Sequence, residues 1–457
     1  MAVPIAPRKK ATNAASKIPG MVKSLISEAH RAKQEGRPTA YSFICSGYDE
    51  IIRAMDITPI WVENFAGVCA AKREAPRFLE RAEAGNFSRS LCTYATCGLG
   101  FDLLREELGQ MPPSAPWGGQ VRPDVMLGSG QMICDPRYKW FQAAQQLMPD
   151  VPVYVTNAFY PPFEDDIDYR EIIDHYVRYM TEELRGLVRF LEKNTRRKMD
   201  WDRLSELVDL TDRTWTLIHN TYELRKAVPT PMDTGDAMNT MVPVAFMMAT
   251  QQCYDFFTEL YAELQDRIAN KIGVIPEEKY RLMWGGGLPS WFALSDFNYF
   301  WSKGAVFPVE TTYRVIEDMA ALDIPRVSDP LEHIAWRYIK YFLRWHDAAR
   351  KRPGSHPDVE RLILYIEDYK IDGIVIHEAF SCRSWHPGLL WQLSVLKKIY
   401  KPVPVLTLGR DGKSSQEYRE VPSLVLESDI VDISSYSEAD THNRIDAFIA
   451  TLESQKK

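Results

Sequence analysis

The chain has 457 residues, of which 45% are hydrophobic and 26% are charged, a composition typical of a globular protein with two or three domains. Its 55 basic and 62 acidic residues give a net charge of -7, which argues against a general nucleic-acid-binding protein because such proteins favour a basic surface. No stretch reaches the roughly 18 apolar residues of a membrane helix, and the N-terminus lacks the apolar segment of a secretory signal, so we expect a cytoplasmic protein that does not bind membranes.

The first half of the chain alternates between strand and helix patterns. Residues 1–37 predict a tail and an amphipathic helix, and residues 38–165 predict a first α/β domain. Its short apolar strands are expected at residues 39–46, 59–63, 124–130 and 151–158. Helical segments separate these strands, which indicates a parallel, doubly wound sheet.

The second half repeats this alternation after a helical interruption. Residues 166–275 carry apolar side chains at three- and four-residue spacing, which predicts long helices that connect two domains. Residues 276–457 predict a second α/β domain, with strands at residues 279–287, 305–310, 373–379 and 403–409. The predicted fold class is therefore α/β, with two doubly wound parallel-sheet domains and a helical region between them.

Seven widely spaced cysteines and no CxxC motif argue against a disulfide framework. Three of them, Cys92, Cys134 and Cys382, lie in connections between elements, and ligands of open α/β sheets bind beyond the carboxyl ends of the strands. Cys45, Cys69 and Cys253 are better explained by packing, and Cys97 is ambiguous because it shares a segment with Cys92.

Three thiolates that converge from distant loops suit a soft-ligand site, either an iron–sulfur cluster or zinc. A cluster held by three cysteines leaves one iron open to a substrate oxygen. The alternative from the pattern alone is that these are loop thiols without a shared partner.

Several segments resemble one family and occur in its order. They are "ICSGYDEIIRAMDITPIWVEN", "SLCTYATCGLG", "ICDPRYKWFQ", "EKYRLMWGGGLPSW", "DGIVIHEAFSCRSWHPGLLWQLSVLKK" and the closing "VLESDIVDISSYSEADTHNRIDAFI". This set is similar to the 2-hydroxyacyl-CoA dehydratase and benzoyl-CoA reductase family over roughly residues 38–452. The resemblance implies a [4Fe-4S] cluster on Cys92, Cys134 and Cys382.

The resemblance also implies partners. Two homologous cluster-carrying subunits pair around an acyl-CoA substrate, and a separate ATP-hydrolysing iron–sulfur activator supplies a low-potential electron. The chain's own "GRDGKSS" is no phosphate loop, because Thr407 stands where that loop needs a glycine.

"YKWFQAAQQ" and "FNYFWSKGAVF" favour the larger cluster-carrying subunit of benzoyl-CoA reductase, which reduces an aromatic acyl-CoA. The alternative is a subunit of an (R)-2-hydroxyacyl-CoA dehydratase, which eliminates water by radical chemistry. Two further alternatives are a non-catalytic electron-relay or scaffold subunit and a zinc-stabilised structural protein.

Three other residues are candidate catalytic groups. Ser46 matches a substrate-contacting serine of the family's dehydratases, with a turn serine as the alternative. Glu63 ends a predicted strand and is either a general base or hydrogen-bond partner at the site, or a solvated carboxylate. His377 is either a proton donor or a core histidine, and His386 offers the same choice. The aromatic residues expected to form a dry wall beside the thiols are Phe380, Trp385, Trp391 and Tyr94.

Overall fold

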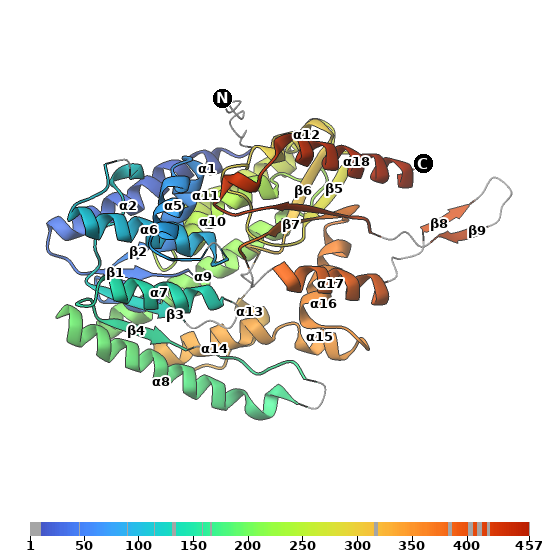
Figure 1. The fold of residues 1–457 in the computed structure, drawn as a ribbon. Helices are drawn as coiled ribbons and strands as arrows, with labels where there is room; N and C mark the ends of the chain where they lie inside the picture. The colour runs from blue at the N-terminus through green and yellow to red at the C-terminus, as the bar shows by residue number, and fades with distance from the viewer. Residues whose placement is uncertain are drawn as a thin grey trace.

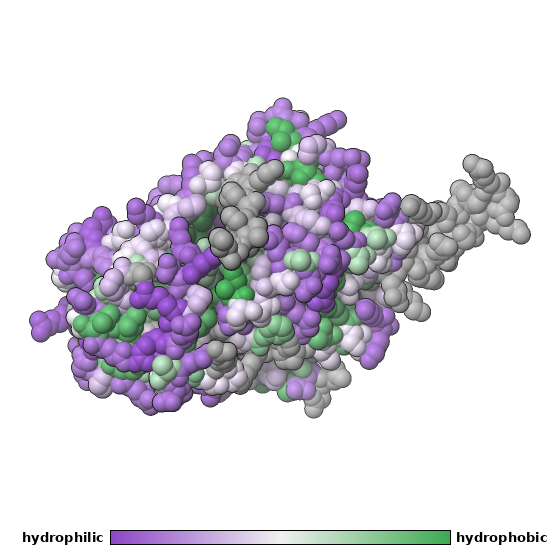
Figure 2. Space-filling view, turned by 45° about the horizontal axis from the view of Figure 1, so that its top comes forward, coloured by the Kyte–Doolittle hydropathy of each residue, from purple (hydrophilic) through white to green (hydrophobic). Residues whose placement is uncertain are grey.

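The computed structural model shows a chain built around two parallel sheets, with helices on both sides of them (Figure 1). It describes residues 11–44, 46–88, 90–113, 115–129, 134–157, 159–164, 167–314, 319–382, 386–400, 405–408, 414–417 and 421–456. No helix in these segments is long and apolar enough to span a membrane. The face shown in Figure 2 is mostly hydrophilic, with apolar side chains in small patches.

The first sheet has the strand order β2-β1-β3-β4, and every pairing is parallel. Its strands are β1 (Thr39–Ser42), β2 (Thr58–Trp61), β3 (Val125–Ser129) and β4 (Val153–Thr156). All residues of β1 and β2 are buried, as expected for a sheet that helices cover on both faces. The helices of this half are α1 (Asn13–Ser16), α2 (Ile18–Gln34), α3 (Asp49–Ala54), α4 (Val62–Ala71), α5 (Ala75–Ala84), α6 (Thr93–Leu108) and α7 (Asp135–Leu147).

Helix α6 begins earlier than its sequence pattern indicates. The polar, glycine-containing stretch around Cys92 predicts a connection before a helix that starts near Phe101, but the helix starts at Thr93, directly after Cys92. The two glycines in it allow close packing rather than a turn. A Cβ on Gly98 would lie 2.3 Å from the Trp140 ring, and one on Gly100 would lie 1.8 Å from the Phe78 carbonyl oxygen of α5.

Long helices connect the two sheets, as predicted. They are α8 (Tyr169–Thr195), α9 (Trp201–Leu224), α10 (Thr234–Phe246) and α11 (Gln251–Ala269). Side chains cap the first backbone N–H groups of each: Asp168, Asp200, Asp233 and Thr250. The apolar faces of α8 and α9 pack against the first sheet's helices and α14, so this region is part of the folded body.

The second sheet has the order β10-β7-β5-β6 and is also entirely parallel. Its strands are β5 (Tyr280–Trp284), β6 (Ala305–Glu310), β7 (Gly373–Ala379) and β10 (Ser423–Ser428). The accompanying helices are α12 (Asp296–Ser302), α13 (Met319–Leu322), α14 (Pro330–Leu343), α15 (His346–Arg350), α16 (Pro357–Asp368), α17 (His386–Ile399) and α18 (Glu438–Lys456). Two all-parallel sheets flanked by helices confirm the predicted fold class, whereas the exact domain boundaries stay a prediction.

Two predicted elements of this half were wrong. The strand expected at 403–409 is β8 (Val405–Leu408), which pairs antiparallel with β9 (Ser414–Glu417) in a hairpin that projects from the body (Figure 1). The fourth strand of the sheet is instead β10, whose alternating burial is the pattern of a strand with one covered face. The pattern of residues 290–304 predicts a helix over the whole stretch, but the helix is confined to α12, and turns precede it at residues 291–295.

One apolar core joins the two halves. The same buried cluster contains Phe65 and Phe101 from the first half and Ala379 and Ile430 from the second. The carboxyl ends of the two sheets therefore meet within a continuous core.

Candidate functional site

A cavity of about 990 Å³ lies where the carboxyl ends of both sheets meet. Every strand of the two sheets contributes a lining residue shortly after its last residue. In strand order these are Ile44, Glu63, Cys134, Tyr160, Leu288, Thr312, Cys382 and Ile430. This is where open α/β sheets bind their ligands.

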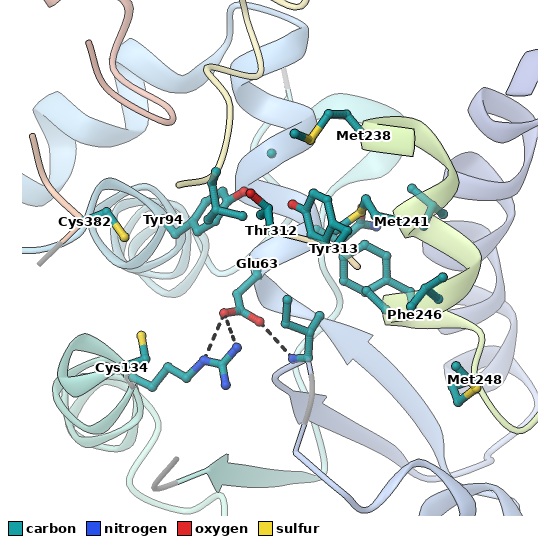
Figure 3. A pocket seen from close by; sticks show the side chains of 18 of the residues that line it. Glu63, Tyr94, Cys134, Met238, Met241, Phe246, Met248, Thr312, Tyr313 and Cys382 are labelled. Carbon is teal, nitrogen blue, oxygen red and sulfur yellow. Dashed lines mark hydrogen bonds and ion pairs between the residues drawn. The ribbon is translucent and has the colours of Figure 1, made fainter. Parts of the chain in front are cut away.

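The three cysteines singled out in the sequence all line this cavity. Burial raises the pKa of the Cys92 thiol, and the neighbouring Cys134 and Cys382 raise it further, so the three sulfurs lie within electrostatic reach of one another. Figure 3 shows the sulfurs of Cys134 and Cys382 pointing toward each other from opposite sides. The structure thus brings together groups that lie 290 residues apart in the chain, from Cys92 to Cys382.

Helix starts support two of these thiols. Cys92 is the residue before α6, and the backbone N–H groups of Tyr94 and Ala95 lower its pKa against the effect of burial. Cys134 is likewise the residue before α7. Helix N-termini stabilise thiolates, the form in which cysteine binds metals.

The thiols of the cavity wall are of the donor type that binds iron–sulfur clusters and zinc. Among the described residues, no group of three or more His, Cys, Asp or Glu side chains is close enough to hold one metal ion.

Glu63 forms a buried ion pair in the cavity wall. It lies in the first turn of α4 rather than at the end of a strand. One carboxylate oxygen accepts from Nε and Nη2 of Arg137, at 3.0 and 2.8 Å, and the other accepts from the Ile44 N–H at 2.9 Å. A carboxylate engaged on both oxygens is a fixed charge that holds Arg137, which lies in the first turn of α7, the helix that Cys134 precedes.

Two tyrosines and a threonine add hydroxyl-bearing side chains to the cavity lining. Tyr94 extends from the first turn of α6, and its oxygen accepts the indole N–H of Trp291. Thr312 and Tyr313 follow β6 and face Tyr94 (Figure 3). Burial raises the pKa of Tyr94 well above its usual value, and the nearby Tyr313, Glu63 and Cys92 add to that shift. Its phenol therefore keeps its proton.

An apolar wall closes the cavity beyond the hydroxyl groups. It consists of side chains from α10 and the turn after it, namely Met238, Met241, Val242, Ala245, Phe246 and Met248. Methionine and phenylalanine adapt to irregular apolar ligands and exclude water.

Another part of the cavity lining is aromatic and polar. It includes Phe163, Trp345, His346, His356 and Arg361. Burial lowers the pKa of His346 to about 4, so this ring is neutral. The lining thus combines an apolar wall on α10 with a polar aromatic part around α15 and α16.

Two sequence candidates lie elsewhere. Ser46 does not line the cavity, and its hydroxyl donates to the Phe43 carbonyl at 2.9 Å. His377 is also absent from the lining, and it hydrogen-bonds the Leu288 carbonyl at 2.6 Å and the Ser428 hydroxyl at 2.8 Å. These contacts are those of a turn serine and a satisfied core histidine.

The predicted aromatic wall is only partly present. Tyr94 lines the cavity, but Phe380 and Trp391 are 55% and 48% exposed. Trp385 and the side chain of His386 lie outside the described part of the structure.

The other cysteines serve packing. Cys69 and Cys97 are fully buried against each other between α4 and α6, and burial and this contact raise the pKa of Cys69. Cys253 is also fully buried, and its thiol donates to the Pro243 carbonyl at 3.2 Å. Cys45 lies outside the described residues.

Sequence reasoning missed Thr312, Tyr313 and the cavity-facing methionines of α10. For Thr312 and Tyr313 the sequence does carry a signal, because both residues closely follow a strand. The apolar run of α10 looked like an ordinary core helix, and nothing in its spacing distinguishes a cavity wall from a packed core.

A comparison with known families decides the relationship. Over residues 48–452, the chain matches the sequence model of the family described as 2-hydroxyglutaryl-CoA dehydratase, D-component. The chain belongs to this family. The resemblance noted in the sequence is therefore confirmed.

Relatives of the chain include both reductase and dehydratase subunits. A benzoyl-CoA reductase subunit of Thauera aromatica is 24% identical over 443 residues, covering 93% of this chain and 91% of the relative. The (R)-2-hydroxyisocaproyl-CoA dehydratase alpha subunit of Clostridioides difficile is 24% identical over 447 residues, with 96% of each covered. The (R)-phenyllactyl-CoA dehydratase alpha subunit of Clostridium sporogenes is 21% identical over 373 residues, or 81% of this chain and 83% of the relative.

Proposed function

We propose that this chain is the [4Fe-4S]-carrying subunit of an acyl-CoA enzyme, with a benzoyl-CoA reductase-like dearomatising reduction as its reaction. The observation that carries the proposal is the meeting of Cys92, Cys134 and Cys382 in one cavity. When bound, such a cluster supplies an electron of very low potential to a substrate that resists reduction.

The chain's own residues would prepare this site. The starts of α6 and α7 favour the thiolate forms of Cys92 and Cys134. The buried Arg137, fixed by Glu63, brings a positive charge into the same cavity wall. The apolar wall of α10 excludes water, which protects a reactive substrate from side reactions.

The cavity lining has an apolar part and a polar aromatic part, and this combination supports an acyl-CoA as the ligand. An acyl-CoA has an apolar acyl group at one end and an adenine nucleotide with phosphates at the other. In the polar part of the lining, the buried side-chain atoms without a hydrogen-bond partner among the described residues include Trp345 Nε1, Arg361 Nε and Gln392 Oε1. Buried polar atoms of this kind need partners, and a nucleotide would provide them.

A dehydratase reaction is the second candidate. It is supported by dehydratase alpha subunits that match this chain as well as the reductase subunit does. Both reactions use the same cavity, so the products of acyl-CoA turnover decide between them.

We also propose two partners. The relatives are named as single subunits of their enzymes, which supports a homologous second subunit around the same substrate. The lack of a phosphate-loop motif in the sequence supports a separate ATP-hydrolysing iron–sulfur activator as the electron source.

Purification without oxygen, followed by metal analysis and turnover assays with a reduced activator, tests the proposal. We expect about four irons per chain, a broad brown absorption band, and conversion of benzoyl-CoA to a ring-reduced product. Conversion of a 2-hydroxyacyl-CoA to an enoyl-CoA instead would establish the dehydratase. Zinc without iron would refute both.

A further inference from the structure

We propose that the phenol of Tyr94 donates a hydrogen bond to the carbonyl oxygen of an acyl thioester in the cavity, and that Trp291 orients this phenol. The inference rests on the proposed function, because it takes the acyl-CoA as the ligand. It adds a substrate-binding group that is not a thiol and comes from the helix that Cys92 begins.

The position of Tyr94 places its hydroxyl between the thiols and the apolar wall. Its ring is 8% exposed and lines the cavity. Cys92 precedes it by two residues, and Figure 3 shows its oxygen on the side of Thr312 and Tyr313. A substrate that reaches the thiols from the apolar end passes this oxygen.

The hydrogen bonds of Tyr94 leave its proton available. A phenol has one proton to donate and an oxygen that accepts. Here the oxygen accepts from the Trp291 indole N–H, which is the only hydrogen-bond partner of the Tyr94 hydroxyl among the described residues. Trp291 is itself held in place, because its backbone N–H donates to the Ile430 carbonyl at 3.2 Å. The Trp291 indole thus orients the phenol, and the phenol proton remains available to an acceptor on a ligand.

Two neighbouring polar groups, Thr312 and Glu63, are already engaged. Thr312 donates its proton to the Gly287 carbonyl at 2.7 Å. Both carboxylate oxygens of Glu63 are occupied by Arg137 and by the Ile44 N–H. A buried donor without an acceptor costs free energy, and a ligand carbonyl removes that cost.

A fixed donor in a dry cavity also suits the chemistry. Reduction places negative charge on the thioester oxygen, and a preorganised donor stabilises that charge more than it stabilises the neutral carbonyl.

Vibrational spectroscopy of bound benzoyl-CoA labelled at the carbonyl carbon tests the assignment in the full chain, purified without oxygen. We expect the carbonyl stretch to move to lower frequency on binding, and the Tyr94→Phe variant to lose most of that shift while its iron content stays unchanged. The kcat of acyl-CoA turnover should fall about 100-fold or more, with KM changed much less.

Two further variants make the result specific. Trp291→Phe keeps the phenol but removes the N–H that orients it, so we expect an intermediate carbonyl shift even where Tyr94→Phe does not fold. Tyr436→Phe is the matched control, because its hydroxyl bonds Asp296 at 2.7 Å and it lies outside the lining of this cavity. It should behave as the unmodified chain.

The outcomes separate this inference from the proposed function. A chain that binds neither iron nor benzoyl-CoA refutes the proposed function. If the chain binds both, only the role of Tyr94 is refuted by either of two results. One is a carbonyl stretch that does not shift on binding to the unmodified chain, and the other is a shift that is as large in Tyr94→Phe and Trp291→Phe as in the unmodified chain.

Discussion

Helix α6 contributes one cysteine to the cavity wall and another to the packed core, and the contrast separates two uses of the same residue. Cys92 precedes the helix, faces the cavity and has two other thiols within electrostatic reach. Cys97 lies about one and a half turns later and is fully buried against Cys69. Position relative to the helix start, rather than burial, therefore distinguishes a candidate ligand from a packing residue.

The largest expected effect is on iron binding. Replacing Cys92 or Cys134 by alanine should remove nearly all iron from the anaerobically purified chain, because two thiols do not hold a cluster as three do. Cys97→Ala is the matched control on the same helix and should retain the iron. Iron analysis and the visible spectrum measure the iron content of these variants. Equal iron in Cys92→Ala and Cys97→Ala would contradict the distinction between a ligand cysteine and a packing cysteine.

The ion pair of the cavity wall should give the next largest effect. Arg137→Met leaves the Glu63 carboxylate buried without its cation, so we expect the free energy of unfolding to fall by about 3–5 kcal/mol. Arg122→Met, which breaks the more exposed pairs with Asp150 and Glu106, should have a much smaller effect. Urea unfolding of the apo chains provides the comparison. Similar losses in the two variants would show that Glu63 reaches water.

In the packed core, replacing a glycine of α6 by a larger residue should destabilise the fold. Gly100→Ala places a Cβ within 1.8 Å of the Phe78 carbonyl oxygen, so α5 and α6 must move apart at a cost of about 2–3 kcal/mol. Gly20 in α2 has no atom within 4 Å of an added methyl group, and its replacement by alanine should stabilise the chain by about 0.5–1 kcal/mol. Thermal unfolding of the two variants measures effects of opposite sign. A tolerated Gly100→Ala would mean that α5 and α6 have room to separate.

The smallest expected effect concerns pH. Burial lowers the pKa of His346 from the usual 6.5 to about 4. Between these values the unfolded chain binds a proton that the folded chain does not, so this histidine's contribution to stability is present above pH 6.5 and lost as the pH falls toward 4. His346→Leu should therefore reduce the pH dependence of the unfolding free energy in this range. His175→Leu, at an exposed position, should leave the slope unchanged, and the same slope in both variants would contradict the burial effect.

Local patterns account for what the sequence predicted well. Short apolar strands between helices indicated two parallel sheets, and the rule for strand ends indicated that Cys134 and Cys382 lie at sheet edges where ligands bind. The start of α6 was missed because glycines usually mark turns, whereas Gly98 and Gly100 are there to admit Trp140 and the backbone of α5. This packing requirement arises from the tertiary structure, so no local sequence pattern reveals it.

Side-chain orientation limited the prediction of the site. Ser46 and His377 were singled out for their places near strand ends, but their hydrogen bonds turn them toward the backbone and the core. Glu63 is at the cavity, but its partner Arg137 is 74 residues away and could not be paired with it from the sequence. Identity and approximate location were predictable, whereas hydrogen-bond partners were not.

The origin of the three thiols has a consequence for biosynthesis. Cys92 and Cys134 belong to the first half of the chain, but Cys382 follows β7, in the second half. A ribosome must therefore complete more than four-fifths of the polypeptide before the last of these sulfurs emerges. Any inorganic group that needs all three must be loaded onto a nearly finished protein, after the two halves have docked.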